Sequence, residues 1–210
     1  MKAATLLLIG LAIAAPAAAQ DPPSVSIRPF VMATEQSFAA VDSFDAVYGK
    51  TLFPFFGGGV QVVVRDGFFA ELSASRFRQT GERAYISGGR AFKLGIPLTT
   101  TITPFEISGG YRFRLRNLPR VRPYAAAGLG SYAYTETSDF AEAGDNVDTT
   151  HTGYLVNGGA EFRFHRWVGV AVDVQYTHIT GILGNGGVSQ QAGESNLGGI
   201  AARVKLVVGR

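Results

Sequence analysis

The sequence contains no cysteine, and this absence removes several classes of site from consideration. Without thiols the chain has no disulfide framework, no thiolate nucleophile and no cysteine-ligated metal. Histidine is also scarce, because only His151, His165 and His178 occur, in three separate segments. No phosphate-binding loop, nucleophile elbow or dinucleotide-binding glycine motif is present. We therefore expect no metal ion, no cofactor and no catalytic site.

Long apolar runs are equally scarce, and the one example lies at the start of the chain. MKAATLLLIGLAIAAPAAAQ has a positive Lys2, an apolar segment over Leu6–Ala15 and small residues at Ala17–Ala19. The alternative, an uncleaved anchor helix, requires ~20 apolar residues. The pattern therefore predicts a cleaved secretory signal peptide over residues 1–19 and a mature domain over residues 20–210.

Amphipathic helices are almost absent, and charge of one sign is not concentrated anywhere. The single helical candidate is Ser37–Lys50, with Ser43 as an expected cap and Gly49 as its end. The net charge is +3, and the basic residues are spread along the chain, so we expect no nucleic-acid partner.

The sequence is rich in regular alternation instead. In AEFRFHRWVGVAVDVQY, Ala160–Tyr176, apolar residues recur at every second position on both sides of a tight turn. A period of two is typical of strands, and a short connection favours an antiparallel hairpin. Similar runs predict about eight strands. They are Val25–Gln36, Phe56–Arg65, Phe68–Thr80, Leu98–Leu115, Val121–Thr137, Gly153–His165, Val168–Thr180 and Leu197–Val208. Arg83–Ile96 is expected to extend the third and fourth strands as a hairpin.

The connections alternate in length, which indicates how the strands are arranged. RDG, RNLPR and HRW are tight, whereas Ser138–His151 and Gly181–Asn196 are long. Short turns at one end and long loops at the other are typical of an up-and-down antiparallel array. No second layer is available to bury the apolar faces. We therefore expect the sheet to close with these faces outward, as an all-β, eight-stranded transmembrane β-barrel. The alternative is a soluble β-sandwich or lipocalin-like barrel.

Closure sorts the side chains into two predicted sets. The charged residues on the polar faces are expected to form a network in the lumen. They are Glu71, Glu106, Arg112, Arg114, Glu161, Arg163, Asp173, Arg203 and Lys205. Aromatic residues toward strand ends are expected to form an interfacial girdle. They are Tyr111, Phe113, Phe162, Phe164, Trp167 and Tyr176.

The alternation, the turn asymmetry and the patches ISGGYRFRL and RPYAAAGLGSYAY resemble those of small OmpA-type outer-membrane β-barrel proteins with one eight-stranded domain. The resemblance covers nearly all of the mature chain. It implies a porin-like barrel in the outer membrane of the Gram-negative cell envelope, with outer-membrane lipid and the barrel-assembly machinery as partners. One departure is the C-terminus, where Val208-Gly209-Arg210 replaces the usual terminal aromatic.

Three functions remain open. The first is a structural or surface-interaction role in which long outer loops such as Ser138–His151 bind an unknown extracellular ligand and charged side chains plug the lumen. The second is a narrow, weakly anion-favouring channel or small-molecule conduit. The third and most remote is a lipid A deacylase-like hydrolase, which the stretch around His178, Thr180 and Glu194 faintly resembles.

Overall fold

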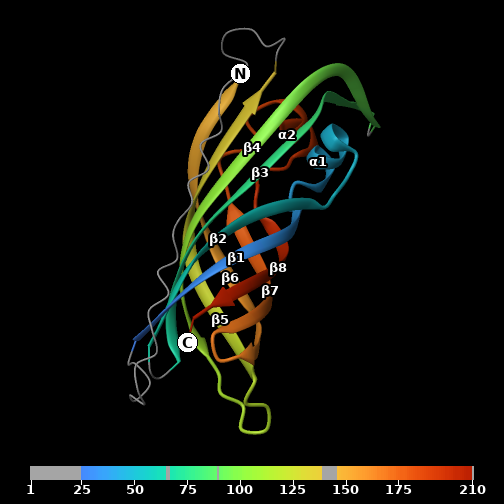
Figure 1. Cartoon of the computed structure of the whole chain (residues 1–210). Coiled ribbons are helices and arrows are strands. Elements are labelled where there is room, and N and C mark those ends of the chain that lie inside the picture. Colours follow the sequence, from blue (N-terminus) through green and yellow to red (C-terminus); the bar gives the residue numbers. More distant parts are fainter. Residues whose placement is uncertain (1–24, 65–66, 89, 139–145, 210) are drawn as a thin grey trace, which may run out of the picture.

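The computed structural model describes residues 25–64, 67–88, 90–138 and 146–209. The predicted signal peptide lies outside the described residues. Eight antiparallel strands form one closed barrel, in which each strand pairs with the next and β1 pairs with β8 (Figure 1). The strands are β1 (Val25–Phe38), β2 (Phe53–Val64), β3 (Phe68–Ser87), β4 (Arg90–Arg112), β5 (Val121–Thr137), β6 (Val147–His165), β7 (Val168–Ile179) and β8 (Gly199–Val208). The predicted fold class is confirmed.

Alternation along each strand places apolar side chains outside and polar ones inside. Asp173 of β7 pairs with Arg203 of β8, and both side chains are buried in the barrel. Their neighbours Val172 and Val204 point outward and are 55% and 51% exposed. Because one strand face must meet the interior, this distribution makes the barrel polar inside and apolar outside.

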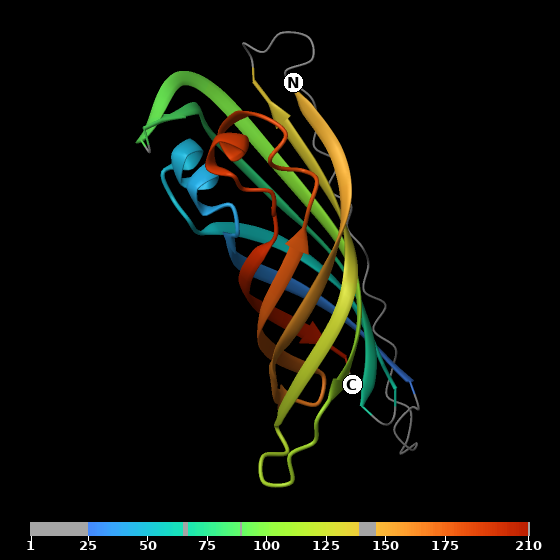
Figure 2. The ribbon, with the colours of Figure 1, turned by 180° about the vertical axis from the view of Figure 1, so that it is seen from behind.

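The two ends of the barrel differ in their connections. The end where β1 begins and β8 finishes also holds the short β2–β3, β4–β5 and β6–β7 connections, and we call it the turn end (Figures 1 and 2). The opposite end, the loop end, carries the long connections and the β3–β4 hairpin. As predicted, residues 83–96 extend β3 and β4 as a hairpin, because their pairing continues beyond Thr99, the last β4 residue that pairs with β5. Its register shifts between Glu82 and Ala84, and Gly88 lies in its turn with φ 58°.

Two short helices lie at the loop end, beneath the β3–β4 hairpin (Figures 1 and 2). Helix α1 (Val41–Tyr48) falls inside the predicted segment and ends at Gly49, which adopts φ 68° as expected of a C-terminal glycine. Ser43 lies within the helix and is not the residue before it, so the predicted cap was wrong. Helix α2 (Gly187–Ala192) was not predicted. Neither helix has the length and hydropathy needed to cross a membrane.

One strand boundary changes the predicted loops. Strand β6 begins at Val147 and not at Gly153, so the last residues of Ser138–His151 are paired with β5. Residues 139–145 of that predicted loop lie outside the described residues.

Candidate functional site

The interior of the barrel at the turn end is built around one carboxylate. Glu161 of β6 is fully buried and accepts charge-assisted hydrogen bonds from Arg28 Nη2 at 2.5 Å and Arg163 Nε at 2.8 Å. Arg112 forms a third ion pair with the same carboxylate. Three guanidinium groups from β1, β4 and β6 therefore face one acid, which leaves positive charge in excess at this end of the lumen.

The middle of the interior has the opposite balance. Asp173 accepts from Arg203 Nε at 2.5 Å and lies 3.3 Å from Lys205 Nζ. Lys205 donates to Glu71 at 2.6 Å, and Arg203 lies 3.8 Å from Glu106. Two cations therefore serve three carboxylates, all of them buried.

Neutral polar side chains complete these interactions. Gln61 donates to Glu71 at 2.6 Å, and Tyr124 donates to Asp173 at 2.5 Å. Tyr132 and Gln175 both donate to Glu106 Oε1, at 2.9 and 3.0 Å. Buried charge is tolerated in proteins when it is paired and hydrogen-bonded, and each of the three carboxylates here meets that condition.

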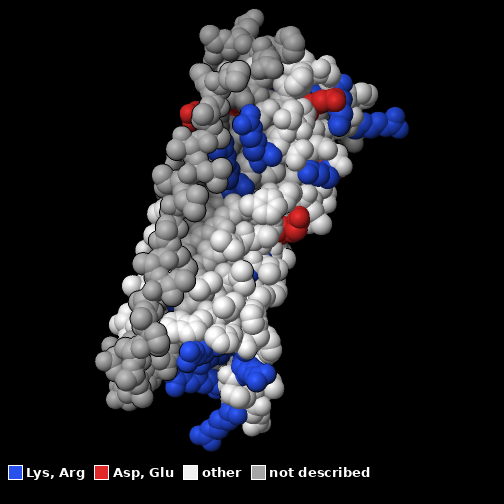
Figure 3. All heavy atoms as spheres, in the orientation of Figure 1, with Lys and Arg blue, Asp and Glu red and all other residues white. Residues whose placement is uncertain are grey.

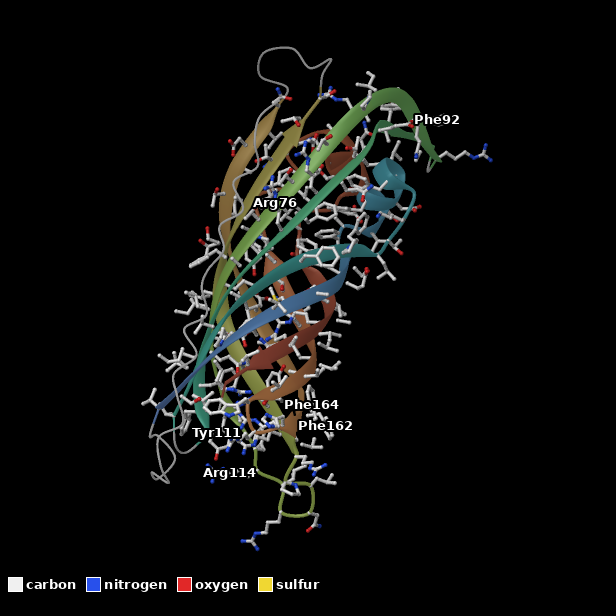
Figure 4. All side chains as sticks on the ribbon, viewed as in Figure 1. Arg76, Phe92, Tyr111, Arg114, Phe162 and Phe164 are labelled. Carbon is white, nitrogen blue, oxygen red and sulfur yellow. The ribbon has the colours of Figure 1, made fainter. Side chains whose placement is uncertain are left out.

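The predicted network and the observed one differ at two arginines. Eight of the nine predicted residues lie in the network described above. Arg114 does not, because β4 ends at Arg112 and Arg114 is exposed in the following connection (Figure 4). Sequence reasoning missed Arg28, which is 1% exposed. Arg28 shares its strand face with the apolar Phe30 and Met32, so the alternation of β1 did not mark that face as polar.

Aromatic side chains fill the interior at the loop end. Phe38 of β1 stacks on Phe44 of α1 with ring centroids 3.9 Å apart. Phe53 of β2 meets Phe77 of β3 edge to face at 5.6 Å. The buried cluster, which we call the aromatic cluster, consists of Phe38, Ala40, Phe44, Phe53, Phe55, Phe77, Ile102, Tyr132, Tyr134, Ile179, Ile182 and Leu197. Helix α1 supplies part of it and so closes over the lumen.

A small cavity separates the polar network from the aromatic cluster. It has a volume of about 30 Å³, and its lining includes Glu106 and Arg203 of the polar network and Phe38, Phe55 and Tyr132 of the aromatic cluster. A cavity of this size holds a water molecule or two at most. Sequence reasoning missed the aromatic cluster, because FPFF at Phe53–Phe56 places aromatics on both strand faces and hides which of them point inward.

The outer surface carries aromatics in two separate groups. Tyr111, Phe162 and Phe164 lie at the turn end (Figure 4), where Tyr111 also contacts Phe113 at 5.2 Å. Tyr176 belongs to the other group, because it lies 6.5 Å from Tyr154 at the far end of β7. All six predicted girdle residues are between 37% and 54% exposed. Figure 3 shows Lys and Arg gathered near both ends of one face, with a mostly uncharged band between them.

A second, larger cavity lies at the loop end. It has a volume of about 660 Å³ and is lined by residues of α1, the β3–β4 hairpin, β5, β6 and the segment containing α2. We call it the loop-end cavity. Phe44, Val47, Leu98 and Ile182 contribute apolar wall, whereas Thr100, Tyr134, Glu136 and Thr149 contribute polar wall from β4, β5 and β6.

Hydrogen bonds hold the walls of the loop-end cavity together. The carboxylate of Glu194 accepts the backbone N–H groups of Asp42 and Ser43 at 3.0 and 2.9 Å, and the Ser43 hydroxyl at 2.5 Å. It therefore caps α1 from a segment about 150 residues away in sequence. Gln191, next to the end of α2, accepts the backbone N–H of Ile86 in β3 at 2.8 Å.

Two tyrosines line the polar side of the cavity. Tyr48 of α1 donates to Thr100 Oγ1 at 2.5 Å, and Tyr134 donates to Glu136 Oε2 at 2.7 Å. Burial, together with the negative charge of Glu136, raises the pKa of Tyr48 to about 12. Tyr48 is therefore a neutral hydrogen-bond donor at physiological pH.

The residues of the remote hydrolase hypothesis are engaged elsewhere. His178 stacks on Tyr154 at 5.1 Å between ring centroids, and Thr180 forms an isolated bridge with Asn196. Glu194 caps α1. Within the described residues no hydrogen bond connects His178, Thr180 and Glu194, and no group of three or more potential metal ligands is found. The geometry therefore gives this hypothesis no support.

Comparison with known proteins assigns the family. Residues 4–199 match the family described as outer membrane protein beta-barrel domain, and the chain belongs to it. Its location is the cell outer membrane. Among curated proteins no sequence matches the chain.

Solved structures agree with the fold. Neisserial surface protein A is 12% identical, with a TM-score of 0.50 over 89% of this chain and 96% of the other. The N-terminal β-barrel domain of Pseudomonas aeruginosa OprF is 12% identical, with a TM-score of 0.49 over 87% and 97%. Ail of Yersinia pestis, solved with the heparin analogue sucrose octasulfate, is 10% identical, with a TM-score of 0.48 over 89% and 97%. In bacterial outer-membrane β-barrels short turns face the periplasm and long loops face outward, and membership of this family therefore makes the loop end the extracellular end.

Proposed function

We propose that this chain is a closed, non-conducting outer-membrane barrel that acts through its extracellular loop end, in a surface-interaction role. The observation that supports this most directly is the filling of the interior. The polar network occupies the turn-end half and the middle, and the aromatic cluster occupies the loop-end half. The cavity between them measures only about 30 Å³.

The size of the barrel favours the same conclusion. Eight strands enclose an interior just wide enough for side chains to fill. Here the side chains are cross-linked by ion pairs between distant strands, such as Arg28 of β1 with Glu161 of β6. A stiff cylinder of this kind suits a support for surface loops. In this proposal outer-membrane lipid contacts the apolar outer face, the barrel-assembly machinery inserts the chain, and an extracellular ligand binds at the loop end.

The conduit hypothesis requires a path through both halves. The described network contains four carboxylates and five cations, which are Arg28, Arg112, Arg163, Arg203 and Lys205. This excess of one positive charge is the feature that would favour passage of anions. The aromatic cluster then stands between that network and the outside. We therefore regard conduction as the second candidate function, after the surface-interaction role.

Planar-bilayer conductance of the refolded protein tests the proposal. A heat-dependent gel shift confirms that the sample is folded, and a large general porin added afterwards confirms that the membrane reports channels. We expect no discrete events before the porin is added. Discrete events with an anion-selective reversal potential would overturn the closed-lumen proposal and support the conduit.

A further inference from the structure

We propose that the loop-end cavity is a binding site for a small cationic amphiphile, a mostly apolar molecule that carries one ammonium group. The inference rests on the proposed function, because it names the ligand class of the same extracellular end. The cavity measures about 660 Å³. Sites for small molecules are typically ~300–1,000 Å³, mostly apolar, with a few fixed polar groups.

The mixed lining of the cavity defines the chemistry of the ligand. Phe44, Val47 and Val188 from the two helices and Leu98 from β4 line it with apolar side chains, which fit an apolar body. Glu136 and Tyr134 of β5, and Thr149 of β6, which pairs with Tyr134, line it with polar groups. A carboxylate accepts hydrogen bonds and favours a positively charged donor.

Glu136 has acceptor capacity to offer. Its Oε2 accepts the Tyr134 hydroxyl at 2.7 Å, and a carboxylate has about four lone-pair positions. It is only half-buried, so a ligand can reach it from the cavity. Arg83 is also part of the wall and has a partner of its own. Among the described residues, Glu194 also lies near the cavity, but it is committed to the N-terminus of α1. Glu136 is the described carboxylate that lines the cavity, and it is the one expected to meet an incoming cation.

The cavity is formed before any ligand arrives. Glu194 fixes α1 to the β7–β8 connection, and Gln191 fixes that connection to β3. Ser189 donates to the Gly186 carbonyl at 3.1 Å and accepts the Gly184 N–H at 3.0 Å, which orders the loop around α2. Walls held by hydrogen bonds lower the entropic cost of ordering them on binding.

Dansylcadaverine provides a direct test, because it joins a fluorescent apolar ring system to one ammonium group. The full barrel is refolded in phosphatidylcholine nanodiscs, and the signal of empty nanodiscs is subtracted. Neutral dansylamide and anionic dansylglycine serve as comparison probes, because they carry the same dansyl group with a different charge. We expect saturable binding, with the cationic probe bound most tightly and the anionic probe most weakly. An absence of saturable binding, or tighter binding of the anionic probe, would overturn the proposal.

Two substitutions locate the probe. Glu136→Gln is expected to weaken the cationic probe about tenfold or more, and to leave the neutral probe unchanged, since it removes only a charge-assisted hydrogen bond. The control is Glu35→Gln on the exposed face of β1. Val188→Trp places an indole ring in the cavity and is expected to weaken binding of both probes. Its control is Val41→Trp, at an exposed position of α1. Unchanged binding in Glu136→Gln would refute the role of this carboxylate, and unchanged binding in Val188→Trp would place the probe elsewhere.

Failure of this inference is distinguishable from failure of the proposed function. If the barrel is silent in bilayers and does not bind the probes, the closed-lumen proposal stands and the cation-site proposal is refuted. If the barrel conducts, and its binding of dansylcadaverine is weakened by Val188→Trp, the closed-lumen proposal is refuted and the cation-site proposal stands.

Discussion

The interior at the turn end holds three arginines around Glu161, whereas the interior at the loop end holds phenylalanines from β1, β2, β3 and α1. Strand β1 shows both chemistries, because Arg28 reaches Glu161 and Phe38 stacks on α1 ten residues later. Within the part of the chain that the structure describes, no helix lies over the turn-end half, which is filled by side chains from facing strands. The loop-end half is covered by α1, and it packs aromatics as a water-excluded core does.

The comparison indicates two structural units within one barrel. We expect stability in the turn-end half to depend on balanced charge between distant strands. In the loop-end half, we expect it to depend on close packing beneath a helix that Glu194 holds in place. We therefore expect a substitution in one half to disturb that half first. The following predictions test this independence in order of decreasing effect.

Glu161→Gln is expected to produce the largest effect, a loss of about 3–5 kcal/mol in the free energy of unfolding, because it leaves buried guanidinium groups without their anion. Urea unfolding in phospholipid vesicles measures the loss. Trp167, the only tryptophan, serves as the reporter at the turn end. Glu35→Gln, at an exposed position, is the control.

A double substitution separates charge imbalance from lost packing. Adding Arg163→Gln to Glu161→Gln removes one of the unbalanced cations and is expected to restore part of the stability. If the double variant is as unstable as the single one, or less stable, charge balance is not what stabilises this half of the interior.

Phe77→Ala tests the other half. Phe77 is 1% exposed and contacts Phe38, Phe53 and Phe55. We expect a loss of about 3 kcal/mol, at the lower end for a buried phenylalanine, because α1 can settle partly into the space. Phe56→Ala is the control on the same sheet, since Phe56 points outward and is 67% exposed.

Hydrogen exchange of the backbone amides shows which segments Phe77→Ala destabilises. Protection is expected to fall in α1 and in the adjoining ends of β1 and β2, while the amides around Glu161 keep theirs. An equal loss of protection at both ends would show that the interior behaves as one unit, which contradicts the two independent units inferred above.

Much of the barrel follows from the sequence, because a period of two marks strand faces without reference to distant residues. The strand order, the longer β3–β4 hairpin and eight of the nine lumen residues were predicted in this way. The errors occur where a face is chemically mixed. Arg28 shares its face with Phe30 and Met32, and Arg114 continues the alternation of β4 beyond the point where the strand ends.

The loop end was less predictable, for a different reason. Its geometry depends on contacts between segments far apart in the chain, such as Glu194 with Ser43 and Gln191 with Ile86. Neither contact leaves a local pattern. The sequence does not predict that Glu194 caps α1, because a lone acid in a long loop does not show which helix it caps. The loop-end cavity follows from these same contacts, and so it was not predicted.

The smallest expected effect concerns Tyr48, which lines the loop-end cavity. Its ring packs against the aromatic cluster, and its hydroxyl donates to Thr100. Burial is the main cause that raises its pKa from 10.0 to about 12, and Glu136 adds to the rise. In the unfolded chain the phenol loses its proton near pH 10, whereas in the folded chain it keeps the proton to about pH 12. The stability associated with the neutral phenol is therefore fully present below pH 10 and is lost as the pH rises to 12.

Near-ultraviolet absorbance of phenolate measures this directly, as the difference between the wild-type barrel and Tyr48→Phe during an alkaline titration. We expect the difference to show a single step near pH 12. In the Glu136→Gln background the step should move to lower pH, because a negative charge that opposes ionisation has been removed; Glu35→Gln should leave it in place. A step near pH 10 in the folded protein would mean that Tyr48 is not enclosed between α1 and β4, and the wall of the cavity would then be open on that side.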